Sequence, residues 1–279
     1  MGKFDRVLLA CDFDNTLVYT EPALVAGEPL PSLTAENREA LESFTAQGGH
    51  FAVATGRALA AFQAIAPGLP INTPCVLCNG AALYDFARDE YLDYNLLDER
   101  ALRRGQALLD DFPTLAVEAY HIGNVVHAVQ SNEYVRRHEH LTHVGTEEKP
   151  SLLAVPLPLG KFIFEDDHAT LQAARRRMTE WGWDADYEIV FSRDNLLEVT
   201  AKGADKGGMV LRLAERLGIA REDVCCVGDE GNDLSMLRVA GHAFAPANGS
   251  AAVKAVSTVV SHAQGPAVAD VVAILDRLY

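Results

Sequence analysis

Two carboxylates near the start of the chain have the spacing of a catalytic or metal-binding pair. Asp12 and Asp14 directly follow an apolar run at residues 7–11. Such a run is typical of a buried strand, and alternate residues of a strand point the same way. Both carboxylates could therefore share the sheet edge at which α/β proteins bind ligands. Two such charges repel unless a cation or a proton lies between them. The pair alone also fits a plain acidic turn.

Polar side chains follow three further predicted strands, and a lysine begins a predicted helix. They are Thr55 after residues 51–54, Asn79 after residues 74–78, Asp229 and Asp233 after residues 224–227, and Lys206 at the start of residues 206–217. A carboxylate can accept a phosphoryl group, and Mg²⁺ prefers carboxylate and phosphate oxygens. A hydroxyl group, backbone N–H groups and a lysine can hold the other phosphoryl oxygens. Together these residue types favour phosphoryl transfer.

The elements that must position these residues alternate between strand and helix in both terminal parts of the chain. This alternation is typical of an α/β fold with a parallel sheet. The middle of the chain is α+β in character, with candidate hairpins around Arg88-Asp89, Gly123-Asn124 and Arg193-Asp194. We therefore predict a core formed by residues 1–82 and 196–279, and an inserted domain formed by residues 83–195.

Two segments are harder to interpret. The segment after Asp14 contains three prolines and a glycine up to Pro31, which predicts a loop or flap over the strand end. Residues 134–158 contain His138, His140 and His143, whose spacing does not place all three on one helix face. We favour a solvated segment over a metal site there.

Composition excludes several classes of protein. The chain has 279 residues, of which 49% are hydrophobic, and a net charge of −15, so a nucleic-acid partner is not expected. No apolar run is long enough to cross a membrane, and no signal peptide is recognisable, so we predict a cytoplasmic protein. The five cysteines lie in apolar surroundings, which favours reduced core thiols over zinc or redox use of Cys75-x-x-Cys78.

The motifs resemble those of the haloacid dehalogenase (HAD) superfamily, in the same order along the chain. The matching segments are Asp12-Phe13-Asp14-Asn15-Thr16-Leu17, Thr55-Gly56-Arg57, Gly203-Ala204-Asp205-Lys206-Gly207 and Gly228-Asp229-Glu230-Gly231-Asn232-Asp233, and Asn79-Gly80-Ala81 resembles a further segment. The second motif is similar to that of Cof-type phosphatases. The resemblance implies a Rossmann-like parallel-sheet core with an inserted α+β cap of the C2 type. Asn15 stands where many members have glycine, and asparagine tolerates turns nearly as well.

The resemblance also implies a role for each matching residue. Asp12 would be the nucleophile, and Asp14 would protonate the leaving group and then activate water. Asp14 would therefore need a pKa raised toward neutral and a side chain free of the metal, with only its backbone carbonyl on Mg²⁺. Asp229 would be a second metal ligand, and Asp233 either a further ligand or an anchor.

The phosphoryl group would be held by Thr55, the Gly56 backbone, Asn79 and Lys206, and Asn232 could hold it through its amide. Two alternatives stay open: Arg57 contacts substrate or pairs with an acid, and Asn232 and Asp233 bind or merely cap a helix.

The function predicted from these roles is a Mg²⁺-dependent phosphatase. Its substrate would be a small phosphorylated metabolite, in particular a sugar phosphate, hydrolysed through an aspartyl-phosphate intermediate by a monomer or homodimer. A phosphosugar mutase with the same core is one alternative, and it would aim basic side chains at the cleft. The candidates for such side chains are Arg103-Arg104, Arg136-Arg137 and Arg175-Arg176-Arg177. A non-catalytic binding protein on the same fold is the other alternative.

Overall fold

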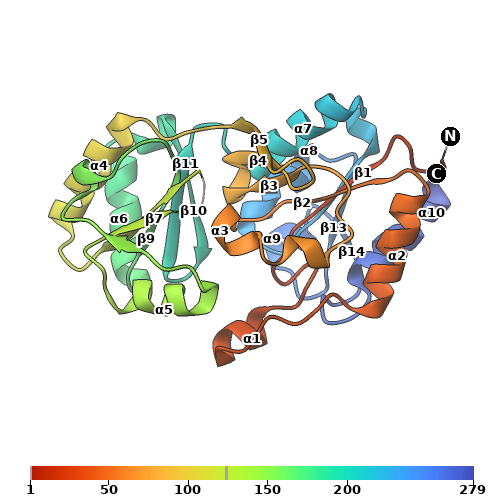
Figure 1. Ribbon diagram of the computed structural model, residues 1–279, viewed down its shortest axis with the longest axis horizontal. Helices are drawn as coiled ribbons and strands as arrows, with labels where there is room; N and C mark the ends of the chain where they lie inside the picture. Colours follow the sequence, from red (N-terminus) through yellow and green to blue (C-terminus); the bar gives the residue numbers. More distant parts are fainter. Residues whose placement is uncertain (1, 123–124) are drawn as a thin grey trace.

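A five-stranded parallel sheet forms the centre of one lobe in the computed structural model, which describes residues 2–122 and 125–279 (Figure 1). Its strand order is β14-β13-β12-β1-β2, with bounds Thr258–Val259, His242–Ala245, Val224–Val227, Leu8–Cys11 and His50–Val53. Leu8 of β1 lies beside Val224 on one side and His50 on the other. Because all neighbouring strands run parallel, their carboxyl ends meet at one edge.

Helices cover both faces of this sheet, because successive side chains of each strand point to opposite sides. Leu9 and Cys11 belong to one apolar cluster, with α2 (Ala35–Ala46) and α10 (Ala267–Leu278). Leu8 and Ala10 belong to another, with α7 (Lys206–Leu217), α8 (Leu234–Val239) and α9 (Ala251–Lys254). This three-layer arrangement is the predicted α/β core.

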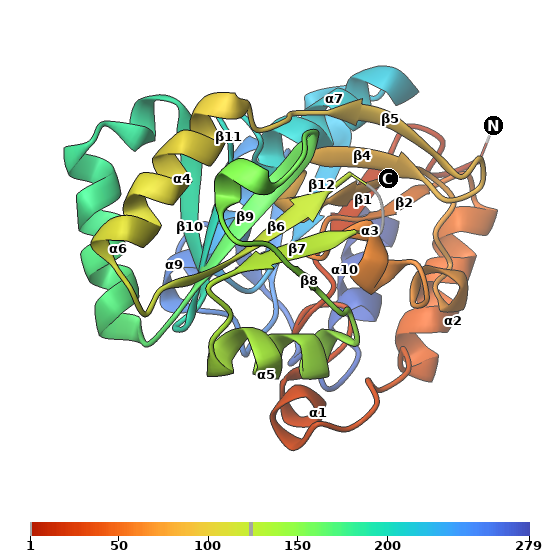
Figure 2. The same ribbon diagram turned by 60° about the vertical axis from the view of Figure 1, so that its left-hand side comes forward.

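The second lobe contains a six-stranded mixed sheet, and we call this lobe the cap (Figures 1 and 2). Its strand order is β10-β11-β9-β6-β7-β8, with bounds Tyr187–Arg193, Leu196–Ala201, Leu159–Glu165, Ala116–His121, Val126–Val129 and Glu147–Glu148. Helices α4 (Glu99–Asp111) and α6 (His168–Glu180) pack on one face through an apolar cluster that includes Phe162 and Phe164. A parallel-sheet core with an inserted α+β domain is therefore confirmed.

Strand pairing shows which segments join the two lobes. β4 (Ala82–Asp85) and β5 (Glu90–Tyr94) form a hairpin that pairs with β3 (Cys75–Leu77), next to the core sheet. β11 pairs with β9 and β10 in the cap sheet. The chain thus passes between sheets after Tyr94 and after Ala201. The limits of the inserted domain, residues 83–195, remain a prediction.

Two segments that were hard to interpret contain helices. The flap holds α1 (Glu21–Ala26), because Pro22 suits a first helical turn and Gly27 ends the helix at φ 68°. The expected loop or flap therefore contains a short helix. The histidine-bearing segment begins with α5 (Glu133–Thr142), which Asn132 caps with its side chain. In both ribbon views α1 lies beside α5.

Short helices complete the chain. They are α3 (Leu59–Phe62) and six 3₁₀ turns at Ala66–Gly68, Cys78–Gly80, Leu152–Ala154, Trp183–Ala185, Arg221–Asp223 and Gly231–Asp233. β6 and β7 pair antiparallel as expected, but the turn predicted at Gly123-Asn124 lies outside the described residues.

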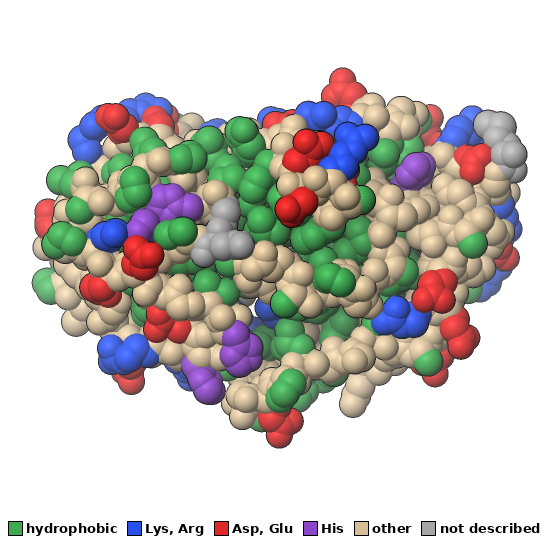
Figure 3. Space-filling model, in the orientation of Figure 1, with side chains coloured by type: hydrophobic (Ala, Val, Ile, Leu, Met, Phe, Trp, Pro, Cys, Tyr) green, Lys and Arg blue, Asp and Glu red, His purple; other side chains and the backbone are tan. Residues whose placement is uncertain are grey.

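The distribution of surface charge and the burial of the cysteines agree with the expectations from composition. On the face that Figure 3 shows, acidic and basic side chains are interspersed rather than gathered in one basic patch. Within residues 2–122 and 125–279, no helix has the length and apolar character of a membrane span. All five cysteines are free and buried, as expected for core thiols.

Candidate active site

The ends of three neighbouring strands bring the predicted acidic and hydroxyl side chains to one edge of the core sheet. Asp12 directly follows β1, and its backbone N–H donates to Val227 O of β12 at 2.9 Å. Asp229 follows β12, and Thr55 follows β2. Thr16, which the motif analysis left without a role, donates its hydroxyl to Asp229 Oδ1 at 2.8 Å.

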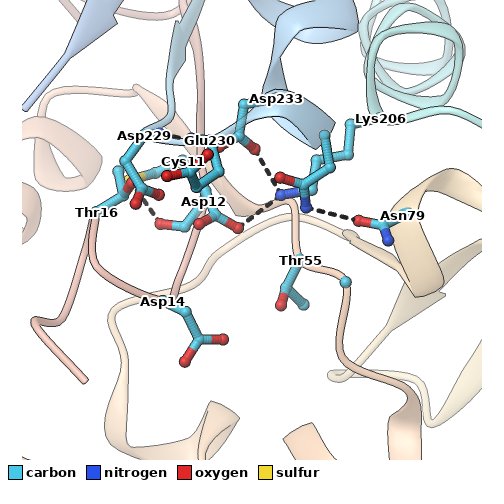
Figure 4. Close-up of polar contacts among 12 residues, drawn as sticks. Cys11, Asp12, Asp14, Thr16, Thr55, Asn79, Lys206, Asp229, Glu230 and Asp233 are labelled. Carbon is cyan, nitrogen blue, oxygen red and sulfur yellow. Dashed lines mark hydrogen bonds and ion pairs between the residues drawn. The ribbon is translucent and has the colours of Figure 1, made fainter. Parts of the chain in front are cut away.

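Lys206 is fully buried between two carboxylates. It begins α7, and its Nζ donates to Asp12 Oδ1 and to Asp233 Oδ1, each at 2.6 Å (Figure 4). Burial lowers the pKa of the Lys206 ammonium, but the two carboxylate charges outweigh burial and leave that pKa above its ordinary value. Lys206 is therefore a permanent cation beside Asp12.

Asp12, Asp229 and Asp233 form a group that could hold a metal ion, because one carboxylate oxygen of each lies within 4.8 Å of the others. Burial raises the pKa of Asp12 well above its ordinary value, and the Lys206 charge offsets only part of this. Burial and the neighbouring Asp233 raise the pKa of Asp229 to about 7. Three buried acids share one lysine, so a divalent cation with a preference for oxygen ligands fits this group.

The oxygens of Asp233 are already used within the protein. Its Oδ1 accepts from Lys206, and its Oδ2 accepts from the backbone N–H groups of Asp229 and Glu230 at 2.9 and 3.0 Å. By contrast, Asp12 Oδ2 and Asp229 Oδ2 accept no hydrogen bond from the described residues. These contacts favour Asp233 as an anchor and leave Asp12 and Asp229 with free ligand atoms.

Asp14 lies apart from this group (Figure 4). Its partner is Arg57. Arg57 donates to both carboxylate oxygens at 2.7 and 2.8 Å, and Thr20 donates to Oδ1 at 2.8 Å. Burial raises the pKa of Asp14, but the Arg57 charge and hydrogen bonds outweigh burial and leave that pKa below its ordinary value. The expectation of a raised pKa was wrong for this structure, because the sequence did not pair Asp14 with Arg57.

A continuous chain of hydrogen bonds connects the core motifs with the cap. Asn232 Nδ2 donates to Asn79 Oδ1 at 3.0 Å, and Asn79 Nδ2 donates to Glu198 Oε2 of β11 at 2.9 Å. Lys161 of β9 donates to the same Glu198 oxygen at 2.8 Å and to Gly56 O at 2.9 Å. The structure therefore uses the Asn79 amide to connect the cap with the core.

Glu198→Gln tests whether this chain of hydrogen bonds stabilises the fold. A neutral amide would leave the Lys161 charge buried without its carboxylate partner, so the free energy of unfolding should fall by about 3 kcal/mol. Chemical denaturation measures this change. The control is Glu188→Gln, because Glu188 forms a more exposed ion pair with Lys202 and should cost about 0.5 kcal/mol or less. An equal, small loss in both variants would contradict the argument.

A cavity of about 240 Å³ lies between core and cap, large enough for a small metabolite. Six of the predicted site residues line it: Asp12, Asp14, Gly56, Arg57, Asp229 and Asn232. Thr55, Asn79, Lys206 and Asp233 are buried next to them, and Thr55 Oγ1 accepts from the Arg57 N–H at 3.1 Å. Leu24 of α1 also lines the cavity, so the flap closes one side of it.

His138 is the main residue that sequence reasoning placed wrongly. His140 and His143 are exposed as expected, but the Nδ1 of His138 contacts Glu118 Oε2 at 2.9 Å and Glu165 Oε1 at 3.1 Å. Burial lowers the pKa of His138, but the two carboxylates outweigh burial and raise that pKa to about 10. One signal in the sequence could have pointed to a partner for His138. Lys161, Ile163 and Glu165 alternate along β9, so their side chains share one face of the strand.

The charge on His138 should make stability depend on pH in the alkaline range. A raised histidine pKa stabilises the fold fully below the unfolded value of 6.5, and this stabilisation is lost as pH rises through about 10. The difference in unfolding free energy between the wild type and His138→Gln should therefore shrink by about 2–3 kcal/mol between about pH 8 and about pH 10. Urea denaturation at several pH values measures it. A constant difference would show that His138 is neutral.

Comparison with known proteins agrees with this geometry. A family model for haloacid dehalogenase-like hydrolases matches residues 9–271. The 5-amino-6-(5-phospho-D-ribitylamino)uracil phosphatase YcsE of Bacillus subtilis is 25% identical over 252 residues, covering 90% of this chain and 87% of that protein. The pyridoxal phosphate phosphatase YbhA of Escherichia coli is 25% identical over 270 residues, covering 91% and 92%.

Solved structures share the whole architecture. A haloacid dehalogenase-like hydrolase from Bacteroides thetaiotaomicron superposes with a TM-score of 0.81 at 23% identity, covering 99% of this chain and all of that one. The two-lobed fold, the order of the motifs and the family match agree with one another. The chain therefore belongs to the haloacid dehalogenase-like hydrolases, which confirms its resemblance to the Cof-type phosphatases of that superfamily.

Proposed function

We propose that this HAD-type phosphatase hydrolyses a small phosphorylated metabolite, in particular a sugar phosphate, through an aspartyl phosphate on Asp12 with Mg²⁺ as cofactor. The observation that carries the proposal is the buried group of Asp12, Asp229, Asp233 and Lys206 on the floor of a metabolite-sized cavity. Asp12 and Asp229 would hold Mg²⁺, which would offset negative charge near the phosphoryl group. We also expect the enzyme to act in the cytoplasm.

The side chains present can carry out both the formation and the hydrolysis of an aspartyl phosphate. A carboxylate oxygen of Asp12 attacks phosphorus, the bond to the leaving oxygen breaks, and Asp14 gives that oxygen a proton. Asp14 then takes a proton from water, which attacks phosphorus, releases phosphate and restores the Asp12 carboxylate. Asp14 must first take up a proton, so its contact with Arg57 has to loosen when substrate binds. Lys206 keeps its positive charge beside Asp12 throughout.

Two relatives support a metabolite as substrate, because YcsE and YbhA are named for small phosphorylated compounds. The mutase alternative receives little support from the arginines named for it. Arg103, Arg104, Arg175 and Arg177 form ion pairs with acids of the cap. Among the arginines considered for that role, Arg137 alone lines the cavity in the described part of the chain.

Release of inorganic phosphate tests the proposal. The purified protein with Mg²⁺ would be assayed against sugar phosphates, nucleotides and cofactor phosphates, and hydrolysis of at least one sugar phosphate is expected. Isomerised sugar phosphate without free phosphate, with dependence on a sugar bisphosphate, would indicate a mutase instead. Binding of ligands without turnover of any compound would indicate a non-catalytic protein.

Asp229→Asn should weaken the metal requirement of the site selectively. Loss of one carboxylate charge from the group should raise the Mg²⁺ concentration for half-maximal activity by about tenfold or more. A Mg²⁺ titration of initial rates measures this value, and EDTA should abolish activity in the wild type. Asp110→Asn, on the exposed side of α4, is the control and should leave the titration unchanged. An unchanged Mg²⁺ dependence in Asp229→Asn would remove Asp229 from the metal site.

A further inference from the structure

The cap wall of the cavity is rich in positive charge, although the chain as a whole is acidic. Arg137, His138, Lys161 and Arg193 line the cavity from the cap, and Glu198 is the one acidic cap residue among the described lining residues. The core wall has the opposite balance. It presents Asp12, Asp14, Asp229 and Glu230, with Arg57 as the cation. The cavity thus has an acidic floor and a cationic cap.

These four cations differ in how far their charge is already compensated. Lys161 is buried and paired with Glu198 at 2.8 Å. Arg137 and Arg193 are exposed, and neither forms an ion pair within the described residues. Their guanidinium groups are therefore available to a ligand. An arginine side chain can bind a carboxylate or a phosphate through two parallel N–H groups.

His138 adds a fixed donor to the cap wall of the cavity. Its Nδ1 is held by Glu118 and Glu165, which are both almost fully buried behind the ring. The other ring nitrogen, Nε2, makes no hydrogen bond with the described residues, and the ring lines the cavity. A ring held by two carboxylates on one side and free on the other can donate its second N–H to a ligand oxygen.

Arg193 lines the same cavity as the residue expected to protonate the leaving oxygen. It ends β10, and both Arg193 and Asp14 face this cavity. Arg137 and His138 come from α5, a different element of the cap. A ligand that reaches from Asp12 toward the cap therefore meets positive groups from two separate elements.

We propose that the leaving group of the substrate carries a second anionic group, a carboxylate or a further phosphate, and that Arg137, His138 and Arg193 bind this group. The proposal rests on the phosphatase function proposed above and narrows its substrate class. A neutral sugar would leave the two arginine charges without a partner in the complex. An anionic group would pair with them. Loss of this pairing should raise KM more than it lowers kcat.

Three probes test this directly: glucose 6-phosphate, 6-phosphogluconate and fructose 1,6-bisphosphate. The first has a neutral leaving group, the second adds a carboxylate and the third adds a phosphate. The wild type should show a kcat/KM at least about tenfold higher for one or both anionic probes, and the preferred probe identifies the group. This preference should weaken as salt is added, because exposed arginines are screened. Equal or lower kcat/KM for both anionic probes would overturn the proposal.

Two variants with a matched control locate the effect. Arg137→Gln and Arg193→Gln should each reduce kcat/KM for the preferred anionic probe at least about fivefold more than for glucose 6-phosphate. Arg136→Gln is the control, because Arg136 is exposed on the same helix but does not line the cavity. His138 is a poorer target, since its removal would leave two buried carboxylates without a partner. Equal losses on all probes would show a structural role only.

Binding separates failure of this inference from failure of the phosphatase function. Calorimetry with the Asp12→Asn variant measures affinity without turnover, and 6-phosphogluconate or fructose 1,6-bisphosphate should bind at least about fivefold more tightly than glucose 6-phosphate. Tighter anionic binding with no wild-type hydrolysis of these probes or of any compound in the phosphate-release panel would retain the cap site and reject the phosphatase. Hydrolysis of glucose 6-phosphate with equal binding of all three probes would reject the cap site and retain the phosphatase.

Discussion

Asp12→Asn is expected to lower kcat for every phosphomonoester substrate by about 10⁴-fold or more. The asparagine amide has nearly the shape of the carboxylate, so Lys206 can still donate to its oxygen and to Asp233. It cannot form an acyl phosphate, because its oxygen is a weak nucleophile. The loss therefore measures covalent catalysis rather than damage to the fold. Stopped assays of phosphate release, at saturating substrate and Mg²⁺, measure it.

Two further measurements distinguish loss of the nucleophile from misfolding and from loss of substrate binding. Thermal unfolding should show that Asp12→Asn folds, and substrate affinity should change far less than kcat. Asp110→Asn controls for the general effect of the substitution, because Asp110 is exposed on α4. If Asp12→Asn retained kcat within about tenfold of the wild type, Asp12 would not be the nucleophile.

The core of this site could be predicted because each of its residues carries a local signal. Asp12, Thr55 and Asp229 follow short apolar strands, and Lys206 begins a helix after a glycine turn. Parallel strands bring such residues to one edge whatever their separation along the chain. The ion pair between Lys206 and Asp12 spans 194 positions, yet it follows from the order of the strands.

The cap side could not be predicted in the same way. Glu198 and Lys161 meet through the register of an antiparallel sheet, and His138 meets Glu165 by the packing of α5 on that sheet. No local pattern specifies either contact. The pKa of Asp14 depends on its ion pair with Arg57, 43 positions away along the chain. Tertiary contacts decide which partner an arginine takes, and the local sequence does not show them. The helix α1 was missed because prolines and a glycine also mark helix ends.

Lys206→Met is expected to reduce both activity and stability, because Lys206 serves two carboxylates at once. Without the ammonium group, Asp12 and Asp233 would face each other in a buried site with no cation from the protein. Breaking such a buried pair costs about 3–5 kcal/mol of unfolding free energy. Because we expect Lys206 to lie next to the phosphoryl group, loss of its charge should lower kcat by about 10²–10³-fold. Chemical denaturation in EDTA and initial rates with Mg²⁺ measure the two effects separately.

The double variant Lys206→Met/Asp233→Asn tells repulsion apart from lost packing. Removing one carboxylate relieves the repulsion, so the double variant should regain about 1–3 kcal/mol over Lys206→Met while its kcat stays low. The control is Lys202→Met, because Lys202 is exposed and should change stability by about 0.5 kcal/mol or less. If the double variant were less stable than Lys206→Met, the aliphatic packing of Lys206 would matter more than its charge. Recovery of stability without recovery of kcat would instead show that one ammonium group both balances the buried acids and acts on the phosphoryl group.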